Sequence, residues 1–466
     1  MQSIDEVSDM ERLEDTLLNG KKRLHFIGIG GSGMFPLVQI LHAKGYEITG
    51  SDVNEGDIIE RERKMGIPVS IGHRAENVHG ADLVIYTAAV LSGNPEIAEA
   101  GRLGIPPAER SVLLGCVAGL YPRPVCIAGT HGKTTTTAMT TQILLMANAD
   151  PAAVIGGKLP MIDAYGRHGA GGEIVVEACE YSNTFLHLRP YLSVLLNVDA
   201  DHLEFFGSMD NLKAAFRKFA QLTTHLVLAN ADDANTMEVT AGLERPVRTF
   251  AINAAADWRA VNVREYRPSF YCFDVEAEGA VLAHIELSAP GRHNVYNALA
   301  AFALATLCGC TPGDCARGLG AFRGAGRRFE FLGEVDGVTI ADDYAHHPTE
   351  LEATLRAAKR MDYRRVWAVF QPFTYSRTEM LLDDFARVLQ IADRVVMTEI
   401  MGSRERAEDY AVRTKDLAAR IPGSVWFDTF DEVVRHVMTQ AQPGDLVITL
   451  GCGDIYKAAR KMLARQ

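Results

Sequence analysis

Residues 128–137 read AGTHGKTTTT, and this stretch decides the fold class. It follows the apolar run Val125-Cys126-Ile127-Ala128 and precedes a helix-compatible stretch that contains Ile143 and Leu144. Strand, glycine loop and helix in this order form a phosphate-binding loop, because backbone N–H groups at a helix N-terminus point at an anion. The stretch therefore predicts an α/β domain that binds ATP.

Each residue type in this loop has an expected task. Glycines allow the close wrap, Lys133 would set a charge on the terminal phosphates, and the Thr134 hydroxyl would face the accompanying Mg²⁺. Only two residues separate the loop's glycines, where the usual pattern has four. The alternative is a tight strand-to-helix turn with an incidental lysine. The expected ATP-binding residues here are Gly129, Thr130, His131, Gly132, Lys133, Thr134 and Thr135.

A second glycine loop, GIGGSG at residues 28–33, follows a strand predicted from Leu24 to Ile29. The next predicted strand ends at Ser51-Asp52, where a dinucleotide-binding fold places its ribose-binding acid. Alone, this fingerprint would indicate a nicotinamide dehydrogenase. A dehydrogenase needs no P-loop lysine, however, and the same fold can hold the diphosphate and ribose of a UDP-sugar. The expected substrate-binding residues are Gly28, Gly30, Gly31, Ser32, Gly33 and Asp52.

The chain of 466 residues is longer than one hydrophobic core usually serves. Strand–helix alternation recurs along it and predicts three tandem doubly wound α/β domains. Residues 22–122 are expected to form a Rossmann-like UDP-binding domain, residues 123–324 a P-loop ATPase-like domain with an antiparallel appendage, and residues 325–466 a Rossmann-like domain.

Composition excludes several functional classes. The formal charge of -12 argues against a nucleic acid or an anionic membrane as the main partner. No apolar run is long enough to span a membrane, and the first residues are acidic, so a cytoplasmic protein is expected. The eight cysteines are scattered; Cys308, Cys310 and Cys315 cluster, but a fourth zinc ligand at suitable spacing is missing.

Two polar residues are expected at strand ends in the middle region. Glu177 closes the apolar run 174–178, and His202 follows the run 192–198. The C-terminal edge of a parallel sheet is where ligands bind, so both side chains should face the ATP loop. Glu177 suits a magnesium ligand and His202 a partner of a second, phosphate-bridged ion. The alternatives are a surface carboxylate and a hydrogen-bonded histidine.

The last third carries the motifs GRRFE at 326–330 and DDYAHHP at 342–348, on either side of a predicted strand. An Asp, a Tyr and paired His at a strand end could bind ribose, stack on adenine and receive an amino acid. The rival is a paired-His metal site, for which the segment offers no third ligand. Arg377 follows a strand and begins a helix, where a guanidinium could clasp a carboxylate in bidentate fashion or simply be solvated.

Taken together, these motifs resemble the Mur ligase family. The resemblance runs from about Leu24 to Lys461 and rests on ordered stretches. They are HFIGIGGSGM at 25–34, AGTHGKTTTT at 128–137, VEACE at 176–180, DADHLE at 199–204, PGRHNVYNALA at 290–300, GRRFE at 326–330, DDYAHHPTE at 342–350 and FQP at 370–372.

The resemblance implies an ATP- and Mg²⁺-dependent amide-forming ligase of peptidoglycan synthesis that joins L-alanine to the lactyl carboxylate of UDP-N-acetylmuramate through an acyl phosphate. It implies catalytic roles for Lys133, Glu177, His202, Arg328 and His346, and metal contacts for Thr134, Glu177 and His202. It adds Asn294, Arg328, Asp343 and Tyr344 to the ATP site, and His73, Thr87, His346 and Arg377 to the substrate site. A monomer or weak homodimer is expected.

Two departures from family patterns bear on the amino acid. Peptide-extending members carry a carbamylated lysine where this chain has Phe216, which supports addition of alanine. Many alanine-adding members have His-Arg after the Gln-Pro, where this chain has Phe373-Thr374, so one alanine contact is missing. The alternatives are a recycling ligase that joins a tripeptide to the same sugar nucleotide, and a nucleotide-dependent binding or regulatory protein.

Overall fold

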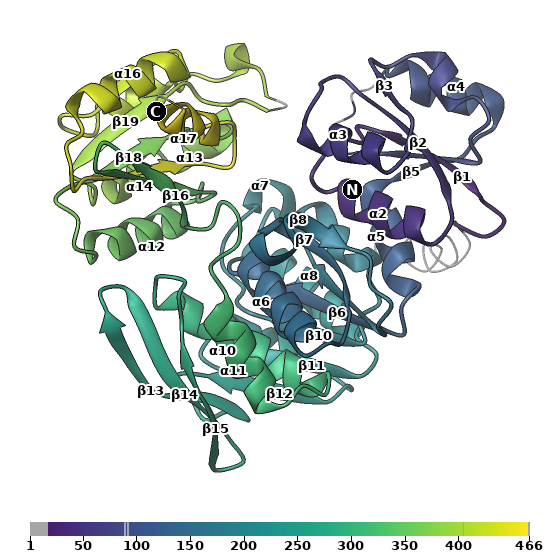
Figure 1. The fold of residues 1–466 in the computed structure, drawn as a ribbon, viewed down its shortest axis with the longest axis horizontal. Helices are drawn as coiled ribbons and strands as arrows, with labels where there is room; N and C mark the ends of the chain where they lie inside the picture. The colour runs from purple at the N-terminus through teal and green to yellow at the C-terminus, as the bar shows by residue number, and fades with distance from the viewer. Residues whose placement is uncertain (1–16, 88–89, 91–92, 404, 465–466) are drawn as a thin grey trace. The chain divides into compact units, whose positions relative to one another are not determined.

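The computed structural model describes residues 17–87, 90, 93–403 and 405–464. The acidic segment at the start of the chain lies outside these residues. The chain divides into two compact units. The first comprises Met1–Val261, Asp274–His284 and Tyr296–Leu319, and the second comprises Asn262–Phe273, Ile285–Val295 and Gly320–Gln466. Three separate sheets carry the fold, as Figure 1 shows.

The first sheet has the order β3-β2-β1-β4-β5 and is parallel throughout. This is a doubly wound order, in which the glycine loop after β1 lies where the strand order reverses. Its elements are β1 (Arg23–Ile27), α2 (Phe35–Ala43), β2 (Glu47–Asp52), α3 (Asp57–Lys64), β3 (Val69–Ile71), η1 (Ala75–Val78), β4 (Leu83–Tyr86), α4 (Pro95–Leu103), β5 (Pro107–Glu109) and α5 (Arg110–Gly119).

The second sheet has ten strands in the order β15-β14-β13-β12-β11-β10-β6-β9-β7-β8. Neighbouring strands from β13 through to β7 pair in parallel, while β7 and β8 pair antiparallel. Only two residues join β14 to β15, a connection that fits antiparallel strands, as predicted for the appendage. The strands are β6 (Arg123–Ala128), β7 (Ala152–Leu159), β8 (Ala164–Arg167), β9 (Glu173–Glu177), β10 (Leu192–Leu195), β11 (Leu226–Asn230), β12 (Val247–Ala251), β13 (Trp258–Arg267), β14 (Phe270–Ala277) and β15 (Ala280–Glu286).

Two helices of this region bear on the phosphate-binding loop. Helix α6 starts directly after the loop, and α10 carries Asn294 and Asn297. The helices are α6 (Lys133–Met146), η2 (Pro160–Ile162), η3 (Tyr181–His187), α7 (Leu203–Phe206), α8 (Met209–Gln221), α9 (Ala234–Thr240), α10 (His293–Leu307) and α11 (Pro312–Ala321).

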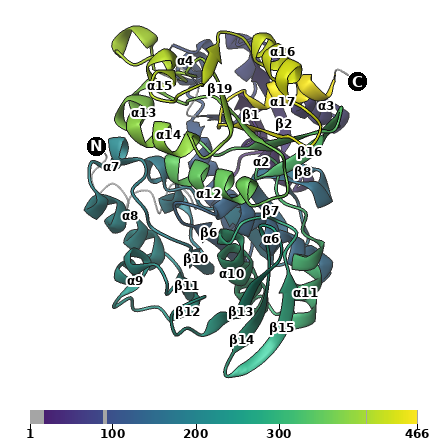
Figure 2. The ribbon, with the colours of Figure 1, turned by 90° about the vertical axis from the view of Figure 1, so that its left-hand side faces the viewer.

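The third sheet has the order β16-β17-β21-β18-β19-β20, with only β16 antiparallel to its neighbour. Residues of β18 alternate between two cores: Ala368 and Phe370 join α12 and α14, whereas Trp367 and Val369 join α16 and α17. Helices therefore cover both faces (Figures 1 and 2). The elements are β16 (Glu330–Val335), β17 (Val338–Asp343), α12 (Pro348–Lys359), β18 (Val366–Phe370), α13 (Tyr375–Met380), α14 (Leu382–Leu389), β19 (Arg394–Thr398), η4 (Ala407–Asp409), α15 (Thr414–Ala418), β20 (Val425–Phe427), α16 (Phe430–Gln440), β21 (Leu446–Leu450) and α17 (Tyr456–Leu463).

The three sheets confirm the predicted fold class of tandem doubly wound α/β domains. The exact boundaries at residues 122 and 324 stay a prediction. Within the described part of the chain, no helix is long and apolar enough to cross a membrane.

Candidate active site

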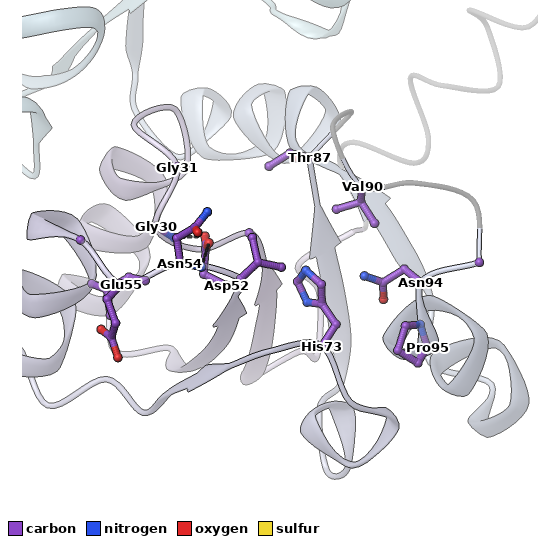
Figure 3. Close-up of a pocket in the computed structure, with 15 residues that line it drawn as sticks. Gly30, Gly31, Asp52, Asn54, Glu55, His73, Thr87, Val90, Asn94 and Pro95 are labelled. Atoms are coloured by element: carbon purple, nitrogen blue, oxygen red, sulfur yellow. Dashed lines mark hydrogen bonds between the residues drawn. The ribbon is translucent and has the colours of Figure 1, made fainter. Parts of the chain in front are cut away.

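A pocket of about 810 Å³ opens at the edge of the first sheet where its strands end (Figure 3). It brings together six of the residues predicted to bind the sugar nucleotide: Gly28, Gly30, Gly31, Asp52, His73 and Thr87. Ser32 and Gly33 are not part of its lining. The pocket is thus located where a doubly wound sheet binds nucleotides.

The carboxylate of Asp52 holds the first glycine loop in shape. Its Oδ2 accepts a hydrogen bond from Gly30 N at 3.1 Å, and its Oδ1 accepts one from Asn54 N at 3.1 Å. A Cβ on Gly30 would stand 3.0 Å from Ile59 Cγ1 and 3.1 Å from Asp52 Oδ2, so a side chain would fit only if these neighbours shifted. Asp52 therefore has a structural role beside the ribose contact predicted for it, and a ribose hydroxyl would share this carboxylate with the loop.

The phosphate-binding loop of the second sheet connects β6 to α6 and needs its glycines. Gly129 has φ +145° and Gly132 has φ +86°, conformations that residues with a Cβ rarely adopt. A Cβ on Gly129 would lie 2.8 Å from Leu196 Cβ, and one on Gly132 would collide with Asn297 Oδ1. The loop is therefore packed tightly between the end of β10 and α10.

Lys133 is held inside this loop by three acceptors. Its Nζ donates to the carbonyl oxygens of Gly129 and Thr130 at 2.6 and 3.0 Å, and it lies 2.8 Å from Glu180 Oε2. Burial alone would lower the pKa of Lys133, but the groups around it, chiefly the Glu180 carboxylate, together outweigh burial and raise the pKa. The ammonium is therefore charged at neutral pH and positioned at the loop, as a phosphate-binding lysine requires.

The predicted metal ligands Thr134 and Glu177 meet at the start of α6. Thr134 Oγ1 donates to Glu177 Oε1 at 2.9 Å, and Gly156 N donates to Glu177 Oε2 at 2.7 Å. A hydroxyl and a carboxylate are the oxygen ligands that Mg²⁺ prefers, together with phosphate oxygens and water. Among the residues described, no cluster of three or more His, Cys, Asp or Glu side chains could hold a metal by itself. The donors present therefore fit Mg²⁺ bound jointly with a nucleotide.

His202 is not at a strand end, contrary to the prediction. Strand β10 ends at Leu195, and His202 follows a further loop, with φ +55° at the start of α7. Its Nε2 lies 3.7 Å from Asp201 Oδ2, and its ring centroid is 4.8 Å from that of Tyr181. The apolar run 192–198 continues past the end of β10 into the loop, so the strand predicted from this run was too long.

The second unit carries several of the predicted residues at the edge of the third sheet. Asp343 ends β17 and is buried; its oxygens accept from Phe329 N, Ala345 N and Thr354 Oγ1 at 2.9, 2.7 and 3.1 Å. Burial raises the pKa of Asp343 to about 6, against the opposing effect of Arg328. These bonds tie the GRRFE and DDYAHHP segments together, and the ribose contact of Asp343 stays a prediction.

Arg328, Tyr344 and His346 lie close to one another in this segment. The Arg328 guanidinium carbon is 5.2 Å from the Tyr344 ring centroid, and the Tyr344 and His346 rings meet edge to face at 5.6 Å. His346 Nδ1 lies 3.1 Å from the Tyr344 carbonyl oxygen and 3.3 Å from Glu350 Oε2. Because a carbonyl oxygen can only accept, Nδ1 carries the hydrogen, and Nε2 is the basic atom of the neutral ring.

Two further predicted residues lie in helices. Asn294 lies in α10, is buried, and donates from Nδ2 to Pro290 O at 2.8 Å. Arg377 lies in the short helix α13 after β18 and is half-buried. Their contacts with adenine and with the substrate stay predictions.

Three residues around the ATP loop were missed by the sequence reasoning: Glu180, Asn197 and Asn297. Glu180 pairs with Lys133, and Asn197 binds both the N–H and the carbonyl of His131, at 2.8 and 3.0 Å. Asn297 Oδ1 accepts from Thr136 Oγ1 at 3.3 Å. Glu180 and Asn297 lie inside the motifs VEACE and PGRHNVYNALA, and Asn197 precedes Val198. Their partners are distant in sequence, so these positions were the only indication of a role.

Comparison with known proteins matches all three regions to one family. "Mur ligase family, catalytic domain" matches residues 23–121, "Mur ligase middle domain" residues 127–305, and "Mur ligase, glutamate ligase domain" residues 327–453. The chain is similar to the UDP-N-acetylmuramate--L-alanine ligase of Caldanaerobacter subterraneus, with 44% identity covering 95% of this chain and 97% of the relative. The Acetivibrio thermocellus protein of the same name is 41% identical, covering 97% and 98%.

Solved structures show the same similarity. The UDP-N-acetylmuramate-alanine ligase of Thermotoga maritima superposes with a TM-score of 0.81 at 28% identity, covering 95% of this chain and 98% of that one. A murein peptide ligase of Psychrobacter arcticus gives 0.76 at 26% identity with the same coverage. The chain belongs to the Mur ligase family.

Proposed function

We propose that this protein joins L-alanine to the lactyl carboxylate of UDP-N-acetylmuramate at the expense of ATP, the first amino-acid addition in the synthesis of peptidoglycan precursors. The observation that carries the proposal is full-length similarity, at 44% and 41% identity, to ligases of that name. The two glycine loops, each between a strand and a helix, support the proposal.

The sugar nucleotide is assigned to the pocket beside the first glycine loop. The N–H groups of Gly28 to Gly31 donate to acceptors within the protein. The positive N-terminal end of α2 is therefore the part of this loop that suits a diphosphate, and Asp52 suits a ribose. The acidic lining provided by Asp52 and Glu55 is a poor match for a further anion. The lactyl group would therefore extend out of this pocket rather than deeper into it.

In the first step, a lactyl carboxylate oxygen attacks the γ-phosphorus of ATP, the bond from that phosphorus to the β,γ-bridging oxygen breaks, and an acyl phosphate and ADP form. Such a transfer depends on positioning and neutralisation of charge. Lys133 would exchange its carbonyl and Glu180 contacts for the terminal phosphate oxygens. Mg²⁺, when bound by Thr134 and Glu177, supplies further neutralisation of phosphate charge. By family resemblance, Arg328 is a further candidate for the γ-phosphate, and His202 is a candidate partner of a second, phosphate-bridged ion.

In the second step, the amine nitrogen of L-alanine attacks the acyl carbon, the C–O bond to phosphate breaks, and the nitrogen loses a proton. His346 is our candidate to receive that proton at Nε2, because Nδ1 is engaged with Tyr344 O and Glu350. Arg377 is the candidate for the alanine carboxylate. Asn294, Asp343 and Tyr344 are assigned to adenosine.

The identity of the amino acid needs a direct test, because Phe373 and Thr374 replace a His-Arg pair of many alanine-adding members. The test is ADP release with Mg²⁺, ATP and UDP-N-acetylmuramate, scanned over single amino acids and the cell-wall tripeptide. Release should depend on L-alanine. Dependence on the tripeptide would move the assignment to the recycling reaction of murein peptide ligases. If no acceptor supports ADP release, the protein is not a ligase of this kind.

A further inference from the structure

A buried carboxylate lies directly behind the sugar-nucleotide pocket. Glu96, in the first turn of α4, has no solvent exposure. Its Oε2 accepts from Ser51 Oγ at 2.8 Å and lies 3.0 Å from His73 Nδ1, and its Oε1 accepts from Asn77 Nδ2 at 2.5 Å. Glu96 itself does not line the pocket, but its neighbour His73 does.

These contacts fix both the orientation and the tautomer of His73. An ionised carboxylate can only accept hydrogen bonds, so His73 Nδ1 carries a hydrogen and donates it to Glu96. The imidazole then projects into the pocket, with Asp52 on one side and Asn94 on the other (Figure 3). Nε2 is consequently the ring atom available for a ligand.

The carboxylate form of Glu96 is supported by its surroundings. Burial alone would raise the pKa of Glu96, but His25, Asn77 and Ser51 outweigh burial and hold the pKa below its ordinary value. His25 Nε2, from β1, lies 3.7 Å from Glu96 Oε1. A buried carboxylate is costly unless its neighbours donate hydrogen bonds to it, and Ser51, Asn77 and His73 surround Glu96.

The charges of the residues that line the pocket indicate what His73 could do there. Among the described lining residues, His73 is the one side chain that can become cationic, whereas Asp52 and Glu55 are acidic and neither Lys nor Arg is present. A diphosphate bound there needs positive partners beyond the N-terminal end of α2. A phosphate oxygen accepts only, so a contact from Nε2 requires the doubly protonated ring.

We propose that Glu96 is a positioning residue for the sugar nucleotide: it holds His73 with Nδ1–H inward, balances the charge of the imidazolium, and so directs Nε2–H at a phosphate oxygen of the UDP group. The inference rests on the proposed function, because it takes a UDP-sugar as the ligand. His73 faces Glu96 of α4 and Asp52 of β2, and His25 of β1 faces Glu96.

The test is calorimetric titration of the full chain with UDP and with uridine, on the wild type and on Glu96→Gln, His73→Gln and the double variant. Each single variant should weaken UDP binding about tenfold, as for one charge-assisted hydrogen bond, and the double variant should be no weaker than the worse single variant. Uridine should bind with nearly unchanged affinity.

Glu99→Gln is the matched control, because Glu99 also lies in α4 but pairs with Arg102 and His79. It should bind UDP as the wild type does. Additive losses in the double variant, or equal losses for UDP and uridine, would overturn the inference. Because Glu96 is buried, unfolding of Glu96→Gln is checked by circular dichroism. If that variant unfolds, the partly exposed His73→Gln decides alone, since it should lose affinity for UDP but not for uridine. Absence of UDP binding by the wild type would instead contradict the proposed function.

Discussion

Replacement of Gly132 by alanine tests the architecture of the ATP loop. Gly132 has φ +86°, and a Cβ at this position would collide with Asn297 Oδ1. A left-handed conformation costs an L-residue about 1–2 kcal/mol. Displacing Asn297 also breaks its hydrogen bond with Thr136, worth about 0.5–1.5 kcal/mol. The loop conformation seen in the structure should therefore be destabilised by roughly 2–3 kcal/mol.

That strain should appear mainly as lost ATP affinity, because the loop relieves it by leaving the conformation that binds phosphate. If the binding conformation costs about 2 kcal/mol more, the apparent Kd for ATP rises about 30-fold, at about 1.4 kcal/mol per factor of ten. The assay is calorimetric titration of Gly132→Ala with Mg²⁺ and a non-hydrolysable ATP analogue. UDP binding to the first sheet's pocket serves as the internal measure of intact folding.

Gly242→Ala is the matched control for the backbone cost alone. Gly242 has φ +65°, but a Cβ there would have no heavy atom within 4 Å. It should lower the thermal unfolding midpoint slightly and leave ATP affinity unchanged. If Gly132→Ala binds the ATP analogue within about twofold of the wild type, the assignment of a tightly packed phosphate loop is wrong.

Three other substitutions have expected outcomes. Burial and the nearby Asp52 raise the pKa of Glu62 to about 8, so the folded state holds this proton and loses stability as pH rises from about 4.5 to 8. In denaturant titrations at about pH 8.5, Glu62→Gln should be more stable than the wild type by up to about 5 kcal/mol, with no gain at about pH 4. Equal stability of the two proteins at about pH 8.5 would contradict this. Burial would raise the pKa of Asp445, but Arg365 keeps this pKa low, so the stability that the Asp445 carboxylate contributes is present at pH 7 and lost as pH falls below about 4. In denaturant titrations, Asp445→Asn should lower the free energy of unfolding by about 3 kcal/mol at pH 7. A smaller loss at pH 7 than at about pH 3 would contradict this. Glu177→Gln should raise the Mg²⁺ concentration for half-maximal ADP release at least about tenfold without changing the Kd for UDP, and an unchanged Mg²⁺ requirement would remove Glu177 from the metal site.

Sequence patterns predicted the third sheet most accurately. The apolar patterns of the sequence predict strands from Val366 to Phe370 and from Leu446 to Leu450 and a helix from Tyr456 to Leu463, and β18, β21 and α17 have these bounds in the structure. These strands are buried on both faces, so they are continuous apolar runs between polar turns. Strand β7 was missed because its sequence AAVIGGKL contains two glycines that weaken a strand pattern.

The site was predictable only where a motif fixes local geometry. Lys133 and Thr134 follow a glycine loop at a helix start, so their positions depend on residues nearby in sequence. The partnership of Glu180 with Lys133 and that of Asn297 with Thr136 join separate elements. Such contacts depend on how helices and strands pack against one another. The spacing of residues within a short motif does not predict them.

Amide formation through an acyl phosphate leaves an isotopic trace that a single experiment can read. UDP-N-acetylmuramate with ¹⁸O in its lactyl carboxylate is incubated with the protein, Mg²⁺, ATP and L-alanine, and both products are analysed by mass spectrometry. We expect a sugar nucleotide heavier by one alanyl residue, and inorganic phosphate that carries one ¹⁸O atom, because the carboxylate oxygen that attacks phosphorus leaves with it. Hydrolysis of ATP without the alanyl product, or an alanyl product whose accompanying phosphate lacks ¹⁸O, would contradict the proposed reaction.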